Sequence, residues 1–179
     1  MIRTLRINGH LGSDQDLSPK QISELISEPD SLVWVSLERP TPLEAQAILQ
    51  DVFQFHPLAI EDCLNTGYQT PKVDDFGRYI FIIAHAIKTD EDHDEVETME
   101  LNIFLSDRFI VTLYLDENMP PIQQLWNQMQ KDDRLTQQGT DFLCYRLLDF
   151  LVDDYMPVLD HLDDEIELLQ DKVLAQPTP

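Results

Sequence analysis

The sequence predicts an α/β protein: an α/β/α sandwich built on a mixed, largely antiparallel sheet and followed by a long C-terminal helix. Two observations favour this fold. Helix-like and strand-like segments alternate at the front of the chain, whereas strands dominate its middle. From about residue 138 the pattern becomes that of one continuous acidic helix. We therefore expect an α/β domain over residues 1–133 and a long acidic helix over 138–176.

The first third of the chain alternates between strands and capped helices. Residues 2–7 alternate apolar and polar side chains, as a half-buried strand does, and the apolar run at 32–37 predicts a buried strand. Between them, a serine cap followed by Pro19 in the first turn predicts a helix over 18–27. A capping-box pattern, with a glutamate three residues after a threonine, opens another helix over 41–53.

The stretch FHPLAIEDCLN, residues 55–65, places four metal-binding or acid–base residue types close together and raises the question of a catalytic site. The spacing argues against one. His56 caps a helix that a proline begins, so His56 and Cys63 lie about 10.5 Å apart along its axis, too far to share a zinc ion. Glu61 and Asp62 diverge by about 100° around the same axis. We therefore interpret this stretch as a short capped helix.

Strand patterns dominate the middle of the chain, where two apolar runs flank a Ser-Asp turn and predict a hairpin. We expect these strands at residues 72–76, 78–88, 99–105 and 108–115. After the two prolines at 120–121, a short helix over 122–131 leads through a polar loop into the long helix, which continues to about Ala175. A single His85 within a strand is interpreted as a core residue rather than a metal ligand.

The charge balance excludes several classes of partner. The formal net charge is −22, from 34 acids against 12 lysines and arginines, which argues against nucleic acids and anionic lipid surfaces. Cys63 and Cys144 form no CxxC pair and fit two reduced thiols in a cytosolic protein. Neither a signal peptide nor a membrane-spanning run is visible, so we expect a soluble chain. No enzyme motif occurs, and we do not expect an enzyme.

The segment from Asp90 to Glu100 contains seven acids, one histidine and no lysine or arginine. One interpretation is a solvated hairpin connection that keeps a sheet edge from aggregating. The other is a divalent-cation site made of oxygen ligands that suit Mg²⁺ or Ca²⁺. The segment lacks the spacing of an EF-hand loop, so a low-affinity site shared with a partner is easier to build than a self-contained one. The residues alone leave both interpretations open.

The long helix carries a heptad seam, which calls for another helix to pack against it. The seam consists of Val152, Tyr155, Leu159, Leu162, Ile166, Leu169 and Val173. Residues 147–179 also contain nine acids and a single lysine. Like-charged pairs at i,i+4, such as Asp160 with Asp164 and Glu167 with Asp171, repel by a few tenths of a kcal/mol each. Such a face is either solvated or neutralised by cations.

Several stretches in the same order resemble the cytosolic N-terminal domain of the CorA magnesium transporter family. They are WVSLERPTPLEA, FHPLAIEDCLN, PKVDDFGRYIFII, ELNIFLSDRFIVT and LLDFLVDDYMPVLDHLDDEIELL, within about Val33 to Leu174. The resemblance implies an α/β/α domain on the cytoplasmic face of a membrane, in a homopentamer whose membrane helices end in a Gly-Met-Asn signature. This chain has neither those helices nor that signature. It therefore resembles a domain that ends within the first helical arm, and any membrane contact would need the missing C-terminal helices.

The resemblance also implies a regulatory role. In the family, intracellular Mg²⁺ binds between neighbouring cytosolic domains and holds the channel closed. Asp90 matches one of the family's ligands and Glu91 follows it, so we expect a low-affinity regulatory Mg²⁺ site here, completed by another copy. Two alternatives stay open: a domain of a zinc-transporting relative, and an acidic protein-interaction module without a metal role. Alone, this fragment is expected as a dimer joined through its seam, or as a monomer.

Overall fold

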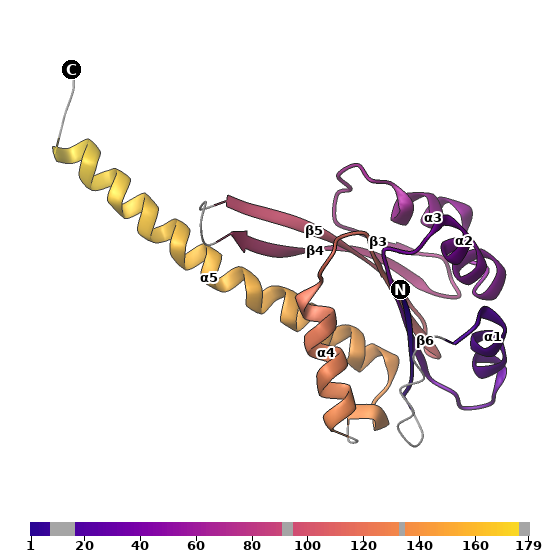
Figure 1. The fold of residues 1–179 in the computed structure, drawn as a ribbon. Coiled ribbons are helices and arrows are strands. Elements are labelled where there is room, and N and C mark those ends of the chain that lie inside the picture. The colour runs from indigo at the N-terminus through magenta and orange to yellow at the C-terminus, as the bar shows by residue number, and fades with distance from the viewer. Residues whose placement is uncertain (8–16, 91–94, 133–134, 176–179) are drawn as a thin grey trace.

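The computed structural model describes residues 1–7, 17–90, 95–132 and 135–175, which form one six-stranded sheet with helices on both faces (Figure 1). The strands are β1 Ile2–Arg6, β2 Val33–Glu38, β3 Lys72–Asp75, β4 Ile80–Asp90, β5 Glu95–Leu105 and β6 Phe109–Tyr114. The helices are α1 Pro19–Ser27, α2 Pro42–Ala45, α3 Pro57–Leu64, α4 Pro120–Lys131 and α5 Thr140–Ala175, with a π-helix η1 Gln46–Val52 and a 3₁₀ turn η2 Leu135–Gln137.

The strand order is β1-β2-β6-β5-β4-β3. Only β2 and β6 run parallel, and the other four neighbouring pairs are antiparallel. The prediction of a mixed, largely antiparallel sheet is confirmed. The longest pairing joins β4 to β5, whose register holds over the whole of both strands from Ile80 opposite Leu105 to Asp90 opposite Glu95.

The caps that the sequence predicts are present. Ser18 accepts from the backbone N–H of Gln21, and Thr41 accepts from that of Glu44, each within a reciprocal capping box. The helix predicted over 41–53 ends where expected, but it is α-helical for only one turn and then widens into η1. The capping signal specifies where a helix begins, whereas packing decides how tightly it is wound.

The two faces of the sheet hold separate hydrophobic clusters, because side chains alternate between the faces along each strand. On one face α1, η1 and α3 cover Val33, Val35 and Phe104. On the other face α4 and the first part of α5 cover Trp34 and Leu101. The helices of the two clusters therefore enclose the sheet between them, which confirms the predicted α/β/α sandwich followed by a long helix (Figure 1).

Two boundaries differ from the sequence prediction. Strands were expected over residues 78–88 and 99–105, but β4 reaches Asp90 and β5 begins at Glu95. The ladder continues past charged side chains because backbone hydrogen bonding in a hairpin does not require a buried face. The division at 133 and 138 stays a prediction. The first three turns of α5 belong to the core, where Leu143, Leu147 and Leu151 are buried.

Candidate functional site

The end of the β4–β5 hairpin positions the first predicted metal residue. Asp90 is the last residue of β4, and its cross-strand partner is Glu95, the first residue of β5. Two residues further in, Lys88 is paired in register with Glu97. The structure describes Asp90 by its backbone, and Glu91 lies outside the described residues. The register therefore brings two acids directly opposite each other at this end, an arrangement that is unfavourable without a compensating positive charge.

The long helix lies against the same hairpin. α5 packs on β4 and β5, and the Tyr155 hydroxyl donates a hydrogen bond of 3.0 Å to the backbone carbonyl of His85 in β4. Beyond this contact, the hairpin and the second part of α5 extend from the sheet on the same side of the molecule (Figure 1). The most acidic helix surface of the chain thus begins beside the hairpin that carries Asp90.

The acids on α5 are in unequal surroundings. Arg146 pairs with Asp149 at 2.8 Å and so neutralises one of them. Burial, followed by the charge of neighbouring Asp153, raises the pKa of the Asp154 carboxyl. A raised carboxyl pKa means that the ionised form is disfavoured at Asp154. A cation close to this surface would lower that pKa and would stabilise the charged form.

The stretch FHPLAIEDCLN forms α3 and its caps, and its chemistry-bearing side chains do not converge. The Nδ1 atom of His56 accepts a 3.2 Å hydrogen bond from the backbone N–H of Leu58, which is a capping contact. Asp62 forms a 2.7 Å ion pair with Lys72. Burial raises the pKa of the Cys63 thiol to about 12, so this thiol is neutral at physiological pH. The interpretation as a structural helix is confirmed.

Sequence reasoning missed a polar pocket on the α3 side of the sheet. Its volume is about 330 Å³, and it lies between the loop that follows α3 and the adjacent part of β4 and β5. Glu100 and Asn102 line it from β5, and His85 lines it from β4. The signal was the strand alternation, which puts Glu100 and Asn102 on the same face as the core residue Phe104. Polar side chains at core-facing positions deserve a function or a partner.

The described ranges 1–7, 17–90, 95–132 and 135–175 contain no group of three or more histidine, cysteine, aspartate or glutamate side chains arranged to hold a metal ion. They also contain no helix that is both long enough and apolar enough to cross a membrane. Both cysteines are free and buried, in agreement with the prediction of two reduced thiols.

Comparison with known proteins places this fold in a family. A sequence profile described as "CorA-like Mg2+ transporter protein" matches residues 29–179. The cobalt/magnesium transport protein CorA of Thermotoga maritima is 31% identical over 149 residues, which span 80% of this chain and 41% of that protein. The chain therefore belongs to the CorA-like Mg²⁺ transporter family, as the resemblance in its sequence predicted.

Solved structures agree with this fold. The complete CorA magnesium transporter of Methanocaldococcus jannaschii superimposes with a TM-score of 0.70 at 20% identity, over 98% of this chain and 51% of that one. The ZntB cytoplasmic domain of Vibrio parahaemolyticus superimposes with a TM-score of 0.68 at 13% identity, over 90% of this chain and 62% of that one. The chain thus spans about half the length of a complete relative.

Proposed function

We propose that this chain is the cytosolic regulatory domain of a CorA-type transporter, which senses Mg²⁺ through a site at Asp90 and Glu91. The observation that carries the proposal is the position of Asp90 at the end of the β4–β5 hairpin, directly opposite Glu95, in a chain of the CorA family. Mg²⁺ takes one or two carboxylates and keeps several waters, so a site of this kind is weak and reversible.

The physical basis is relief of repulsion. Each copy carries a net charge of −22, and acids oppose each other in register at the hairpin end. A cation that binds between two copies attracts both acidic surfaces, so it stabilises the assembled arrangement relative to a separated one. Loss of the cation leaves the repulsion uncompensated and shifts the population towards the separated arrangement, which would open the pore.

The partners of the domain are other copies of the same chain. In the complete protein we propose a homopentamer on the cytoplasmic face of the membrane, with membrane contact made only through helices beyond this chain. Nucleic acid is not a partner, because the chain has too few basic groups to neutralise phosphates. The domain works by binding and conformational change rather than by catalysing a reaction.

Two alternatives are favoured by particular observations. The likeness to a ZntB cytoplasmic domain concerns the fold and supports a zinc-transporting relative as the second candidate. The excess of exposed acids would also suit an acidic interaction module without a metal role. The three proposals differ in their response to cations: the first requires Mg²⁺, the second Zn²⁺, and the third responds only to ionic strength.

The deciding experiment combines thermal unfolding with sedimentation velocity in MgCl₂, in ZnCl₂ and in NaCl at matched ionic strength. We expect millimolar-range Mg²⁺ to raise the unfolding midpoint or the sedimentation coefficient beyond the effect of NaCl. Asp90→Asn should remove most of that difference. The matched control is Asp107→Asn, which deletes one exposed acid from the β5–β6 turn at the other end of β5 and should keep the full Mg²⁺ response.

Equal responses to MgCl₂ and NaCl in the wild-type chain would contradict Mg²⁺ sensing at this site. A larger response to Zn²⁺ than to Mg²⁺, lost in Asp90→Asn, would favour the zinc-transporting relative instead. Loss of the Mg²⁺ response in both variants would show that the acids act as a diffuse charge and not as a site.

A further inference from the structure

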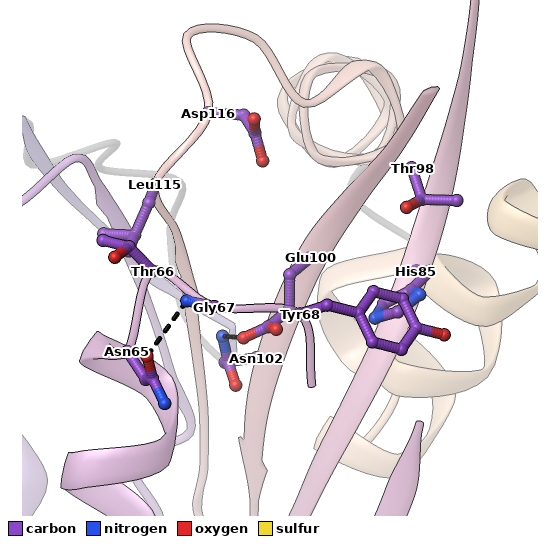
Figure 2. A pocket seen from close by; sticks show the side chains of 10 residues that line it. All are labelled: Asn65, Thr66, Gly67, Tyr68, His85, Thr98, Glu100, Asn102, Leu115 and Asp116. Atoms are coloured by element: carbon purple, nitrogen blue, oxygen red, sulfur yellow. Dashed lines mark hydrogen bonds between the residues drawn. The ribbon is translucent and has the colours of Figure 1, made fainter. Parts of the chain in front are cut away.

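The β4–β5 hairpin extends beyond the rest of the sheet and leaves one edge of β5 without a neighbouring strand (Figure 1). β5 is 11 residues long, but β6 pairs only with residues 102–105. On that side, residues 95–101 have no partner strand among the described residues. The chain leaves β6 after Tyr114, and Asp116 then lines the same pocket as Glu100 (Figure 2).

The alternation of hydrogen bonds identifies the backbone groups that point to this open edge. In an antiparallel sheet, successive residues of an inner strand bond to the strand on one side and then to the strand on the other. Directly after β5, the N–H of Ser106 donates to the carbonyl of Phe109, so the even-numbered residues of β5 face β6. The carbonyl of His85 in β4 accepts from Tyr155 and therefore points away from β5, as does the backbone of its register partner Glu100 from β4.

The open edge is accessible at Val96 and Thr98. By the same alternation, the backbone N–H and C=O groups of these two residues point outward from the hairpin. Val96 is 47% exposed, and Thr98 is exposed as well. Tyr155 of α5 reaches the other edge of the hairpin, on β4 at His85. An added strand would therefore meet two N–H donors and two carbonyl acceptors, which is how extended peptides join a sheet.

The charge of the edge indicates the chemistry of its partner. This stretch of β5 includes Glu95, Glu97 and Glu100 and neither lysine nor arginine. Lys88, the register partner of Glu97 on β4, supplies one positive charge against these three. Acids along an edge keep two identical edges apart, so a second copy of the chain does not fit here. A strand with basic side chains is attracted instead, on both faces, because Glu97 and Glu100 lie on opposite faces of β5.

We propose that the open edge of β5 at Val96 and Thr98 binds an extended segment of a partner protein that is rich in lysine or arginine, which joins the sheet as a further strand. The backbone groups of β5 hold the segment, and the glutamates select its charge. The site needs neither Asp90 nor Mg²⁺, so it is separate from the proposed sensing site.

The test is amide hydrogen exchange of the ¹⁵N-labelled chain with and without the peptide Ac-Lys-Thr-Lys-Thr-Lys-Thr-NH₂. The N–H groups of Val96 and Thr98 become bonded only in the complex. At about 90% occupancy their exchange should therefore slow about tenfold, since only the free chain exchanges. The amides of Glu97 and Met99 already face β4, and their exchange should change less than about twofold.

Spermidine is the control for charge, because it carries as many positive charges as the peptide but has no peptide groups. It should leave the exchange of Val96 and Thr98 unchanged. Equal slowing by spermidine, or slowing of Glu97 and Met99 by the same factor, would overturn the proposal, because charge or general stabilisation would then be sufficient. Slowing that grows with protein concentration in the absence of peptide would assign the edge to a second copy and would also overturn it.

Two variants at one position separate the backbone from the side chain. Val96→Pro removes the outward N–H and places a ring in the path of the added strand, at an edge position where proline is tolerated. Calorimetric titration should show peptide binding weakened about tenfold or more. The matched control Val96→Ala keeps the N–H and should retain binding within about threefold. Unchanged binding in Val96→Pro, or an equal loss in Val96→Ala, would contradict backbone pairing. The exchange experiment uses the unaltered chain and does not depend on how the variants fold.

A neutral peptide tests the charge selection. Ac-Ser-Thr-Ser-Thr-Ser-Thr-NH₂ offers the same backbone and should bind at least about tenfold more weakly, because it lacks the attraction to the glutamates. Equal affinity of the two peptides would overturn the assignment of a basic partner. Asp90→Asn should retain binding of the lysine peptide whether or not it loses its Mg²⁺ response, so this proposal and the Mg²⁺-sensing proposal fail separately.

Discussion

The two halves of α5 have apolar residues at similar helical spacing but lie in different surroundings. In the first half, Leu147 and Leu151 are buried between the sheet and α4. In the second half, Leu162 is 43% exposed and Ile166 is 50% exposed. Periodic apolar residues therefore predict that a helix face is suited to burial, but they do not show what buries it. The first half of α5 is packed into the fold, and the apolar residues of the second half are exposed.

The largest expected effect separates the two halves by stability. Leu147→Ala should lower the free energy of unfolding by about 2–5 kcal/mol, because it removes buried methyl groups and leaves a cavity. The control is Leu162→Ala, which makes the same chemical change on the exposed half and should cost about 0.5 kcal/mol or less. Urea unfolding followed by circular dichroism measures both values. Equal losses would mean that the second half is also packed in solution.

The two halves of α5 can also be compared by the reactivity of a cysteine thiol placed in each. Burial, followed by the charge of Asp141, raises the pKa of Cys144 in the first half of α5 to about 11. An ordinary exposed thiol has a pKa near 8.5–9, so at pH 8 the thiolate of Cys144 is about 100-fold scarcer. Iodoacetamide should therefore alkylate Cys144 at least about 100-fold more slowly than the thiol introduced by Leu169→Cys in the second half.

Mass spectrometry of the peptides after timed quenching distinguishes the two thiols. Similar alkylation rates at both positions would contradict the packing of the first half of α5.

The raised pKa of Cys144 also makes the stability of the fold depend on pH. Since the folded pKa of Cys144 lies above the unfolded value, its contribution to stability is complete below about pH 8.5 and is lost as the pH rises towards about 11. Cys144→Ala should flatten that decline.

Local signals explain why much of the fold can be predicted from the sequence. The caps at Ser18, Thr41 and His56 each depend on residues within three positions, and strand alternation identifies the buried faces. The parallel pairing of β2 with β6 has no such local signal. It joins Val33 to Phe109, 76 positions apart in the sequence (109 − 33), and it depends on how the intervening elements pack. The order of the layers is therefore easier to predict from the sequence than the order of the strands in the sheet.

The acidic segment at Asp90 and Glu91 and the pocket that contains Asn102 also differ in how far the sequence alone reveals them. Asp90 and Glu91 stand out in the sequence because acids are concentrated there, and a family resemblance gives them a role that stays a prediction. Asn102 does not stand out, since one asparagine in an apolar strand has no distinctive pattern. Its significance depends on a hydrogen bond to Glu100 and on a loop from a different part of the chain. A buried acceptor can be counted only when its surroundings are known.

The smallest expected effect concerns what covers the second half of α5. We expect two copies of this chain to pair weakly through the seam, because Leu159, Leu162 and Ile166 are exposed at the spacing that helix pairing requires. The repelling acids on the same helix oppose this pairing by about 1 kcal/mol in total. Raising NaCl from about 0.02 to about 0.5 M screens them and should tighten the dimer about fivefold in sedimentation equilibrium.

Two variants distinguish seam pairing from general salt effects. Ile166→Lys places a charge in the seam and should leave a monomer at every salt concentration, although it reduces the net negative charge. Glu167→Gln makes the same charge change, one unit less negative, next to the seam and should instead strengthen the dimer, because it relieves the repulsion with Asp171. If both variants tighten association, charge alone controls it. A wild-type chain that stays monomeric while α5 remains helical would mean that a segment other than a second copy is needed to cover this face.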